Sequence, residues 1–144
     1  MARRLRRSAA GPHLLSKEEI VQFATQYDPI PRLINGQAAL RSVFGGLTAS
    51  GSHTFAIFVL LTGQLQPHFQ VLIGLGWDEV RLPNPVRPSD ELDLEMTVLE
   101  MRESNSKPDR VSFAIEICSG LAQRSIQLNP SRLHDSVPLL RFVE

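Results

Sequence analysis

The segment that most constrains the fold is TFAIFVLL, which runs from Thr54 to Leu61. It follows Ser50-Gly51-Ser52, a pattern typical of a helix start, and it has no polar face over two helical turns. Exposing any side of such a helix to water costs free energy, so protein has to surround it. A chain of 144 residues has only its own sheet or that of a partner for this purpose. The sequence therefore predicts a buried central helix that begins near residue 50.

The second half of the chain has the pattern of β-strands. Apolar residues occupy every second position from 92 to 98 and again from 111 to 117. This alternation is typical of strands that have one face in the core and one in water. Turn residues then predict a third strand over 122–128, and an apolar stretch predicts another over 70–82. The expected fold class is α+β, in which an antiparallel sheet covers the central helix.

The region before the central helix is predicted to hold a helix, an ordered loop and a shorter helix. Ser16 and Glu19 have the spacing of a capping box, in which each side chain binds a free backbone amide at a helix start. This helix should end near Tyr27, because a proline follows two positions later. Residues 28–35 contain two prolines and predict an ordered loop, and residues 37–41 predict a short helix.

The charged residues are distributed unevenly, although 15 Lys and Arg balance 15 Asp and Glu. Four of the arginines lie within the first seven residues, and no acidic residue occurs among the first 13. We expect a flexible basic tail over residues 1–14 and a single domain over residues 15–144. The rest of the chain is mildly acidic, which argues against binding of nucleic acid, because phosphate contacts need clustered Lys and Arg on a folded surface.

Two further features exclude other classes of protein. Cys118 is the only cysteine, which excludes a disulfide framework and a thiolate zinc site, and we expect no metal and no cofactor. The longest apolar stretch, from 55 to 61, is far shorter than the roughly 18 residues of a membrane-spanning helix. No apolar segment follows the N-terminal arginines, which argues against a secretory signal. We expect a cytoplasmic protein that makes no membrane contact.

Three segments follow one another in the chain: FATQYDPIP at 23–31, FGGLTASGSHT at 44–54 and DEVRLPNPVRPSDEL at 78–92. Together they resemble the MaoC-like dehydratases, the group that contains the (R)-specific enoyl-CoA hydratases. The resemblance covers about residues 18–128. It implies the hot dog fold, in which an antiparallel sheet wraps around a long central helix, and it implies assembly as a dimer. The helix and strand patterns described above agree with this fold.

The resemblance also implies site residues. In the family, the catalytic pair is an Asp just after the first helix and a His five residues later. Asp28 occupies the first of these positions, whereas Leu33 occupies the position of the histidine. Asn35 replaces the acidic residue that follows the histidine. Gly51 matches the family position whose backbone amide binds the substrate oxyanion, so the catalytic residues implied for this chain are Asp28 and Gly51.

Hydration of an enoyl thioester requires a group that deprotonates water, a proton donor at Cα and stabilisation of the enolate oxygen. Asp28 is the candidate acid and base, although an Asp before proline is also common as a turn residue with local hydrogen bonds. The Gly51 amide is the candidate oxyanion donor, since the first amides of a helix are unpaired and lie at the positive end of its dipole. The candidate substrate contacts, of which the last two have alternative roles as a helix cap and a packing residue, are Leu33, Asn35, Ser50 and His53.

Three functions remain open at this level. The first is an acyl-thioester hydratase or dehydratase, impaired by the missing histidine. The second is a non-catalytic subunit that binds an acyl thioester or completes the active site of a partner. The third is an acyl-CoA thioesterase, against which the absence of Asp and Glu from 54 to 63 counts. The expected partners are an acyl thioester, carried by CoA or an acyl carrier protein, and a second hot dog subunit in a homodimer or heterodimer.

Overall fold

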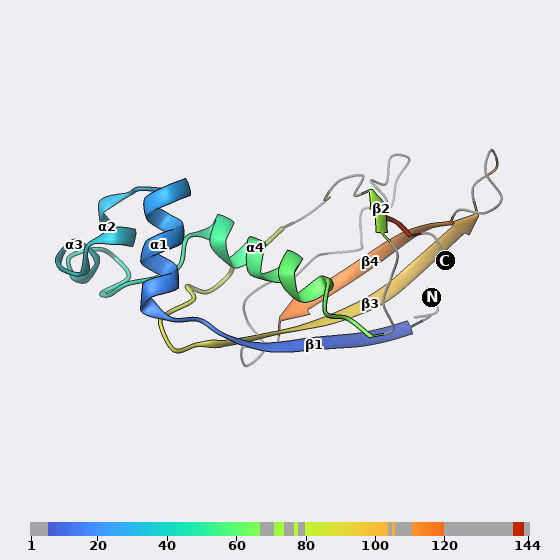
Figure 1. Ribbon diagram of the computed structural model, residues 1–144, viewed down its shortest axis with the longest axis horizontal. Coiled ribbons are helices and arrows are strands. Elements are labelled where there is room, and N and C mark those ends of the chain that lie inside the picture. Colours follow the sequence, from blue (N-terminus) through green and yellow to red (C-terminus); the bar gives the residue numbers. More distant parts are fainter. Residues whose placement is uncertain are drawn as a thin grey trace.

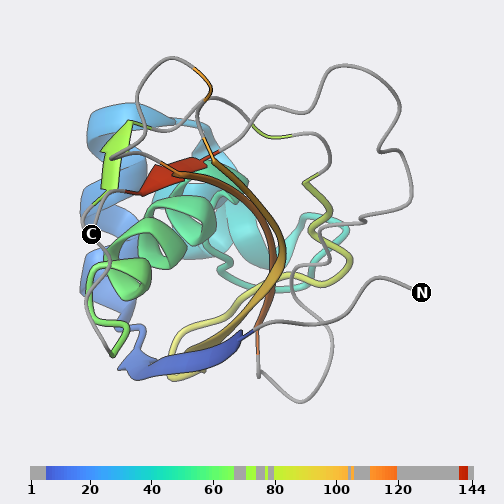
Figure 2. The same cartoon turned by 90° about the vertical axis from the view of Figure 1, so that its right-hand side faces the viewer.

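The structure is a computed structural model that describes residues 6–66, 71–73, 77, 80–103, 105, 111–119 and 140–142. Its central element is the helix α4 (Gly51–Thr62), which lies on the concave side of a curved sheet (Figure 1, Figure 2). The predicted central helix is therefore confirmed. It begins where the sequence indicated, because the Ser50 side chain caps it by accepting a hydrogen bond from the backbone amide of His53.

Within the described ranges, five strands form one antiparallel sheet in the order β1-β3-β4-β5-β2. Their bounds are β1 (Arg6–Leu14), β2 (Val71–Ile73), β3 (Glu91–Glu103), β4 (Val111–Ser119) and β5 (Leu140–Phe142). The strands predicted over 92–98 and 111–117 are confirmed as parts of β3 and β4. The strand predicted over 122–128 lies outside the described residues. Of the stretch 70–82, the described part forms a strand only at β2.

The prediction for the N-terminus is wrong for residues 6–14, which form the edge strand β1 rather than a flexible tail. β1 pairs antiparallel with β3. The side chains that β1 turns toward the core are small, since Ser8 is buried and Ala10 packs against the buried cluster. Small residues that follow the arginines give no apolar alternation, so the sequence pattern did not indicate the strand. Residues 1–5 of the predicted tail lie outside the described residues.

A bulge interrupts the pairing of β1 with β3 between Ala10 and His13. Gly11 lies within the bulge at a φ of +105°, where a residue with a side chain would be strained. A Cβ atom at this position would lie 2.9 Å from the carbonyl oxygen of Leu92 in β3. Glycine is therefore required for the close approach of the two strands, and the register resumes with His13 opposite Leu92.

Three shorter helices gather beside the N-terminal end of α4 (Figure 1): α1 (Lys17–Tyr27), α2 (Pro31–Ile34) and α3 (Gly36–Leu40). The helix predicted from the capping box is confirmed, because the amide of Glu19 donates to Oγ of Ser16 at 3.0 Å. The predicted short helix is confirmed as α3. The loop predicted over residues 28–35 is wrong in part, since α2 lies within it. Pro31 is the first residue of α2, a position where its fixed φ and missing amide favour a helix.

The core lies between α4 and the sheet. Ile57, Phe58 and Leu61 of α4 are at most 3% exposed and share one buried cluster with the apolar side chains of β3. The other side of α4 is open, because Val59 and Leu60 are each 51% exposed. The chain by itself therefore buries only part of its apolar central helix. In the described part of the chain, none of the helices is long and apolar enough to cross a membrane.

Candidate active site

A pocket of about 230 Å³ lies at the N-terminal end of α4. Residues from the end of α1, from α2, from the loop that leads into α4 and from the segment 82–86 line it. Three of the predicted site residues line this pocket: Asp28, Ser50 and Gly51. The other three, which are absent from its lining, are Leu33, Asn35 and His53.

The start of α4 presents unpaired backbone donors to the pocket. Oγ of Ser50 accepts from the amide of His53 at 3.1 Å, and the carbonyl oxygen of Ser50 accepts from the amide of Thr54 at 3.0 Å. The amides of Gly51 and Ser52 make no hydrogen bond to any described residue. They lie at the positive end of the helix dipole, where an anionic oxygen is stabilised. The Gly51 amide can therefore serve as an oxyanion donor.

The pocket wall also comes very close to α4 at Gly51. A Cβ atom on Gly51 would lie 2.8 Å from Cδ1 of Leu82, a distance that real Cβ contacts do not show. Leu82 belongs to the segment that lines the pocket and is 40% exposed. The absence of a side chain at position 51 thus lets Leu82 pack over the helix start while the backbone amide faces the pocket.

Asp28 follows α1 directly and lines the pocket as a half-buried residue. Its backbone ends the helix, since the Asp28 amide donates to the carbonyl oxygen of Ala24 at 2.9 Å. Its carboxylate makes no hydrogen bond or ion pair with the described residues, so the interpretation as a turn residue with local side-chain hydrogen bonds finds no support. A carboxylate that faces a pocket without a protein partner is available to a substrate or a water molecule.

Arg32 and Thr48 are polar pocket residues that were not identified from the sequence. Arg32, in α2, lines the pocket, and its guanidinium lies over the ring of Phe44 at 5.1 Å from the ring centre. Thr48 lines the pocket from the loop before α4 and is only 3% exposed, yet its hydroxyl makes no hydrogen bond to the described residues. The one available signal was the position of Arg32, one residue before the place where the resemblance expects a histidine.

Leu33 and Asn35, two of the predicted substrate contacts, have structural roles in the fold. Leu33 is completely buried and does not line the pocket. Asn35 caps α3, because its Oδ1 accepts from the amides of Gln37 at 2.9 Å and Ala38 at 3.1 Å. These contacts explain both residue types without a substrate. Binding of substrate by Leu33 or Asn35 stays a prediction that the lining of the pocket does not support.

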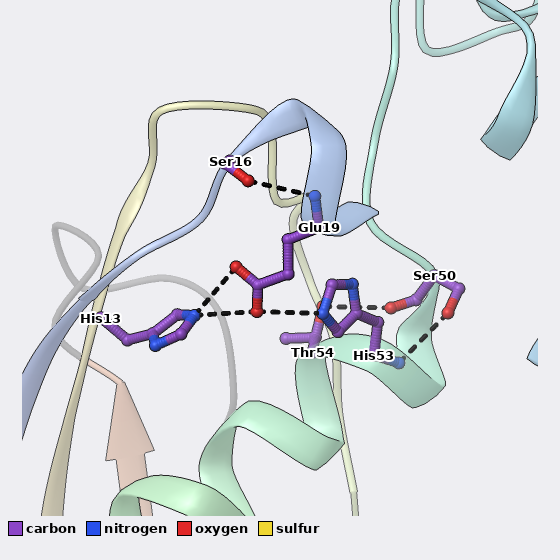
Figure 3. Close-up of polar contacts among 6 residues, drawn as sticks. All are labelled: His13, Ser16, Glu19, Ser50, His53 and Thr54. Atoms are coloured by element: carbon purple, nitrogen blue, oxygen red, sulfur yellow. Dashed lines mark hydrogen bonds and ion pairs between the residues drawn. The ribbon is translucent and has the colours of Figure 1, made fainter. Parts of the chain in front are cut away.

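His53 lies in a cluster between α1, β1 and α4 (Figure 3). Its ring stacks on Phe23 with the ring centres 4.3 Å apart, and it is 3% exposed. Its Nε2 lies 3.5 Å from Oε1 of Glu19, and the same carboxylate lies 3.0 Å and 3.2 Å from Nε2 of His13. The Glu19 side chain thus contacts two histidines, one on β1 and one on α4.

The electrostatics of this cluster favour a neutral His53. Burial lowers the pKa of His53 from its ordinary value of 6.5, and the charge of Glu19 offsets only part of this effect. A protonated His13 nearby lowers it further. Nδ1 of His53 is buried and has no hydrogen-bond partner among the described residues. A stacked, neutral imidazole is the form expected of a packing residue, and contact of His53 with substrate stays a prediction.

The pocket combines groups suited to reactions that develop charge on a carbonyl oxygen. Asp28 can accept and return a proton, and the Gly51 amide can stabilise an oxyanion. Arg32 adds a fixed positive charge on the same lining. Among the residues that the structure describes, no group of three His, Cys, Asp or Glu side chains is placed to hold a metal ion.

Comparisons with known proteins agree with this architecture. The model of the MaoC like domain matches residues 5–116, which include β1. The chain is 26% identical over 115 residues to the uncharacterized protein YdeM of Bacillus subtilis (strain 168), covering 79% of each chain. The MaoC-like dehydratase from Rhodospirillum rubrum is 31% identical, with a TM-score of 0.78 and coverage of 96% of this chain and 90% of that one.

A third likeness is to the (R)-hydratase from A. caviae involved in PHA biosynthesis, at 18% identity and a TM-score of 0.64. It covers 87% of this chain and 91% of that chain. At this identity the likeness shows the fold, and the hot dog fold implied by the sequence is confirmed. Since the family model covers most of the chain and includes its central helix, its three N-terminal helices and its first long strands, the chain belongs to the MaoC-like domain family.

Proposed function

We propose that this protein is an acyl-thioester hydratase or dehydratase that acts on an enoyl group carried by CoA or an acyl carrier protein. The observation that carries the proposal is the shared pocket of Asp28 and Gly51, in which an unpaired carboxylate lies near the start of α4 and its free amide. Membership of the MaoC-like domain family and the likeness to a MaoC-like dehydratase support the same reaction class.

The proposed reaction uses these two groups in sequence. Asp28 accepts a proton from a water molecule while the water oxygen bonds to Cβ of the enoyl group. The electron pair of the double bond moves toward the thioester, and the Gly51 amide stabilises the negative charge on its oxygen. Asp28 then returns the proton to Cα, so that water has been added across the double bond. Dehydration is the same path in reverse.

The proposed catalyst is slower than one with an aspartate and a histidine. Leu33 is completely buried where the resemblance expects the histidine, and neither His13 nor His53 lines the pocket. General acid–base assistance is typically worth about two to four orders of magnitude. A single carboxylate that serves as both base and acid is expected to retain only part of that range.

The proposed role of Asp28 is tested by the loss of absorbance of the conjugated thioester when crotonyl-CoA is hydrated. We expect Asp28→Asn to lower kcat/KM by about a hundredfold or more, because the amide cannot accept the proton. The matched control is Asp93→Asn, which removes an exposed carboxylate from β3 and should leave the rate unchanged. Unchanged activity in Asp28→Asn would refute the assigned role.

A second candidate function is a binding subunit in a pair of hot dog subunits. It is favoured by the apolar surface of Val59 and Leu60, which a second subunit would cover, and by the buried Leu33. In this case the chain binds the acyl thioester and the partner supplies the histidine. Turnover of crotonyl-CoA by the isolated homodimer would argue against this function. Hydrolysis by an acidic residue on the central helix is not proposed, because α4 contains none.

A further inference from the structure

The pocket contains a positive charge that the described chain does not neutralise. The guanidinium of Arg32 makes no ion pair or hydrogen bond with any described residue, and Asp28 on the same lining lies beyond ion-pair distance from it. Its one described contact is the face of Phe44, at 5.1 Å from the ring centre. A cation held over an aromatic face keeps its N–H donors available for another partner.

The backbone of the residue whose ring supports Arg32 is held in place by hydrogen bonds. Arg87 donates a hydrogen bond from its guanidinium to the carbonyl oxygen of Phe44 at 2.7 Å. The backbone amide of Arg87 donates to Oδ2 of Asp90 at 2.7 Å, which fixes Arg87 in turn. These contacts connect the loop before α4, which carries the ring under Arg32, to the segment before β3.

The second unused polar group on the pocket lining is the hydroxyl of Thr48. This residue is only 3% exposed, and its hydroxyl makes no hydrogen bond to the described residues. A hydroxyl on a pocket wall that makes no hydrogen bond within the described chain is available to a ligand or a water molecule. Arg32 and Thr48 both donate hydrogen bonds, and together with the Gly51 amide they make the pocket rich in donors.

We propose that the pocket binds an acyl thioester whose acyl group carries its own carboxylate, and that Arg32 and Thr48 bind this carboxylate. The proposal rests on the proposed function, in which the Gly51 amide holds the thioester oxygen. Arg32 and Gly51 line one cavity of about 230 Å³, so an anion at Arg32 lies close to the thioester group. The phosphates of CoA lie at the far end of the pantetheine arm, beyond the reach of a cavity of this size. A carboxylate on the acyl group is therefore the favoured anion.

An uncharged acyl chain would fit this pocket less well. It would face the guanidinium of Arg32 with carbon atoms and displace water from a cation that makes no ion pair with the described residues, Asp28 on the same lining included. A carboxylate instead accepts charge-assisted hydrogen bonds, which are among the strongest in proteins, and the fork of the guanidinium can bind both of its oxygens.

The test compares two saturated thioesters of equal chain length, succinyl-CoA and butyryl-CoA, by isothermal titration calorimetry. Neither undergoes hydration, so the measurement does not depend on catalysis. We expect the protein to bind succinyl-CoA at least about tenfold more tightly, and Arg32→Gln to remove this preference. Thr48→Val should weaken only succinyl-CoA, by a smaller factor. The matched control is Arg41→Gln, which neutralises an exposed arginine outside the pocket and should keep the preference.

The remaining outcomes each contradict a different claim. If Arg32→Gln weakens both thioesters equally, the arginine binds the phosphates of CoA and the proposal of an acyl carboxylate fails. If the native protein binds both thioesters without preference, this inference fails while the proposed function stands. If it binds neither thioester, the proposed function fails as well.

Discussion

At the scale of single residues, position 51 shows how a missing methyl group shapes the pocket. The Gly51 backbone lies so close to Leu82 that a Cβ atom would be 2.8 Å from Cδ1 of that side chain. The same backbone supplies the unpaired amide at the start of α4. The absence of a side chain at Gly51 therefore allows Leu82 to pack against the helix start and leaves the Gly51 amide accessible to a thioester oxygen.

We expect Gly51→Ala to impair the reaction more than the fold. Leu82 is 40% exposed and can move away from the new methyl group, so the melting temperature should change little. The displaced side chain then crowds the oxyanion site, and we expect kcat/KM for crotonyl-CoA to fall at least about tenfold. Gly36→Ala is the matched control, because a Cβ atom there meets no heavy atom within 4 Å. Alanine keeps the backbone amide, so a fully active Gly51→Ala protein would contradict the expected crowding of the oxyanion site by Leu82.

The sequence predicted only part of this pocket. The family pattern indicated Asp28 and Gly51 because each occupies a fixed place beside a helix end. Thr48 carries no local signal, and Arg32 carries only its place beside the position expected for the histidine; both line the pocket through the packing of α2 and the loop before α4 against the segment 82–86. Which side chains line a cavity depends on such tertiary contacts, and a single sequence does not contain them.

At the scale of elements, the carboxylate of Glu19 on α1 connects α1 to both β1 and α4. The capping-box pattern predicted that this side chain would bind the backbone near Ser16, and the Ser16 half of the box is present. The carboxylate instead contacts His13 on β1 and His53 on α4 (Figure 3). The histidine contacts therefore link the edge strand and the first helix to the start of the central helix, close to the amide of Gly51.

We expect this cluster to make folding stability depend on pH. The folded pKa of His53 lies below 6.5, so the unfolded chain binds a proton there more readily than the folded chain. The stability that neutral His53 contributes is complete above pH 6.5 and is lost as the pH falls through the folded pKa. Urea titrations from about pH 8 to about pH 5 should show the free energy of unfolding decreasing over this window.

Two variants distinguish the contribution of His53 to the pH dependence from that of its neighbours. His53→Gln should remove most of the pH dependence. His13→Gln should keep it, because burial and not His13 is the main cause of the lowered pKa of His53. The groups that face His53 are Glu19 from α1 and His13 from β1. A pH dependence that is equal in the native protein and His53→Gln would contradict this assignment.

The elements themselves were predicted where the local signal is strong. The cap at Ser16 located α1, the apolar run located α4, and the alternation of apolar residues located β3 and β4. β1 lacks such alternation and is a strand because β3 offers it backbone partners, whereas β5, with only three residues, is too short for alternation to indicate a strand. The short helix α2 lies in a segment that its two prolines predicted to be a loop, whereas proline is favoured at the first position of a helix.

At the scale of the whole molecule, the open side of α4 indicates that the single chain is incomplete. Val59 and Leu60 are half exposed on a helix that has no polar side. Burying apolar surface gains about 25 cal/mol per Å², so covering these side chains would stabilise an assembly. We propose that a second copy of the chain covers this face.

The corresponding prediction is that Leu60→Asp dissociates the assembly without unfolding the chain. Burial of the new carboxylate between two subunits would be strongly unfavourable, whereas in the separated chain it faces water. Sedimentation velocity should show a dimer for the native protein and a monomer for Leu60→Asp, with similar circular dichroism spectra. Val43→Asp is the control, because Val43 is 96% exposed and lies outside α4. A native monomer would contradict the proposal.

The edge position of β1 has a practical consequence for work with this protein. Trypsin cleaves after arginine, and Arg6 and Arg7 are the first residues of a strand that belongs to the sheet. A protease needs an extended, unpaired backbone, so these two bonds are protected while β1 is docked on β3 and are cut when it detaches. Arginines that the sequence placed in a flexible tail thus act as cleavage sites within a strand, and the rate of limited digestion reports how often the first strand leaves the sheet.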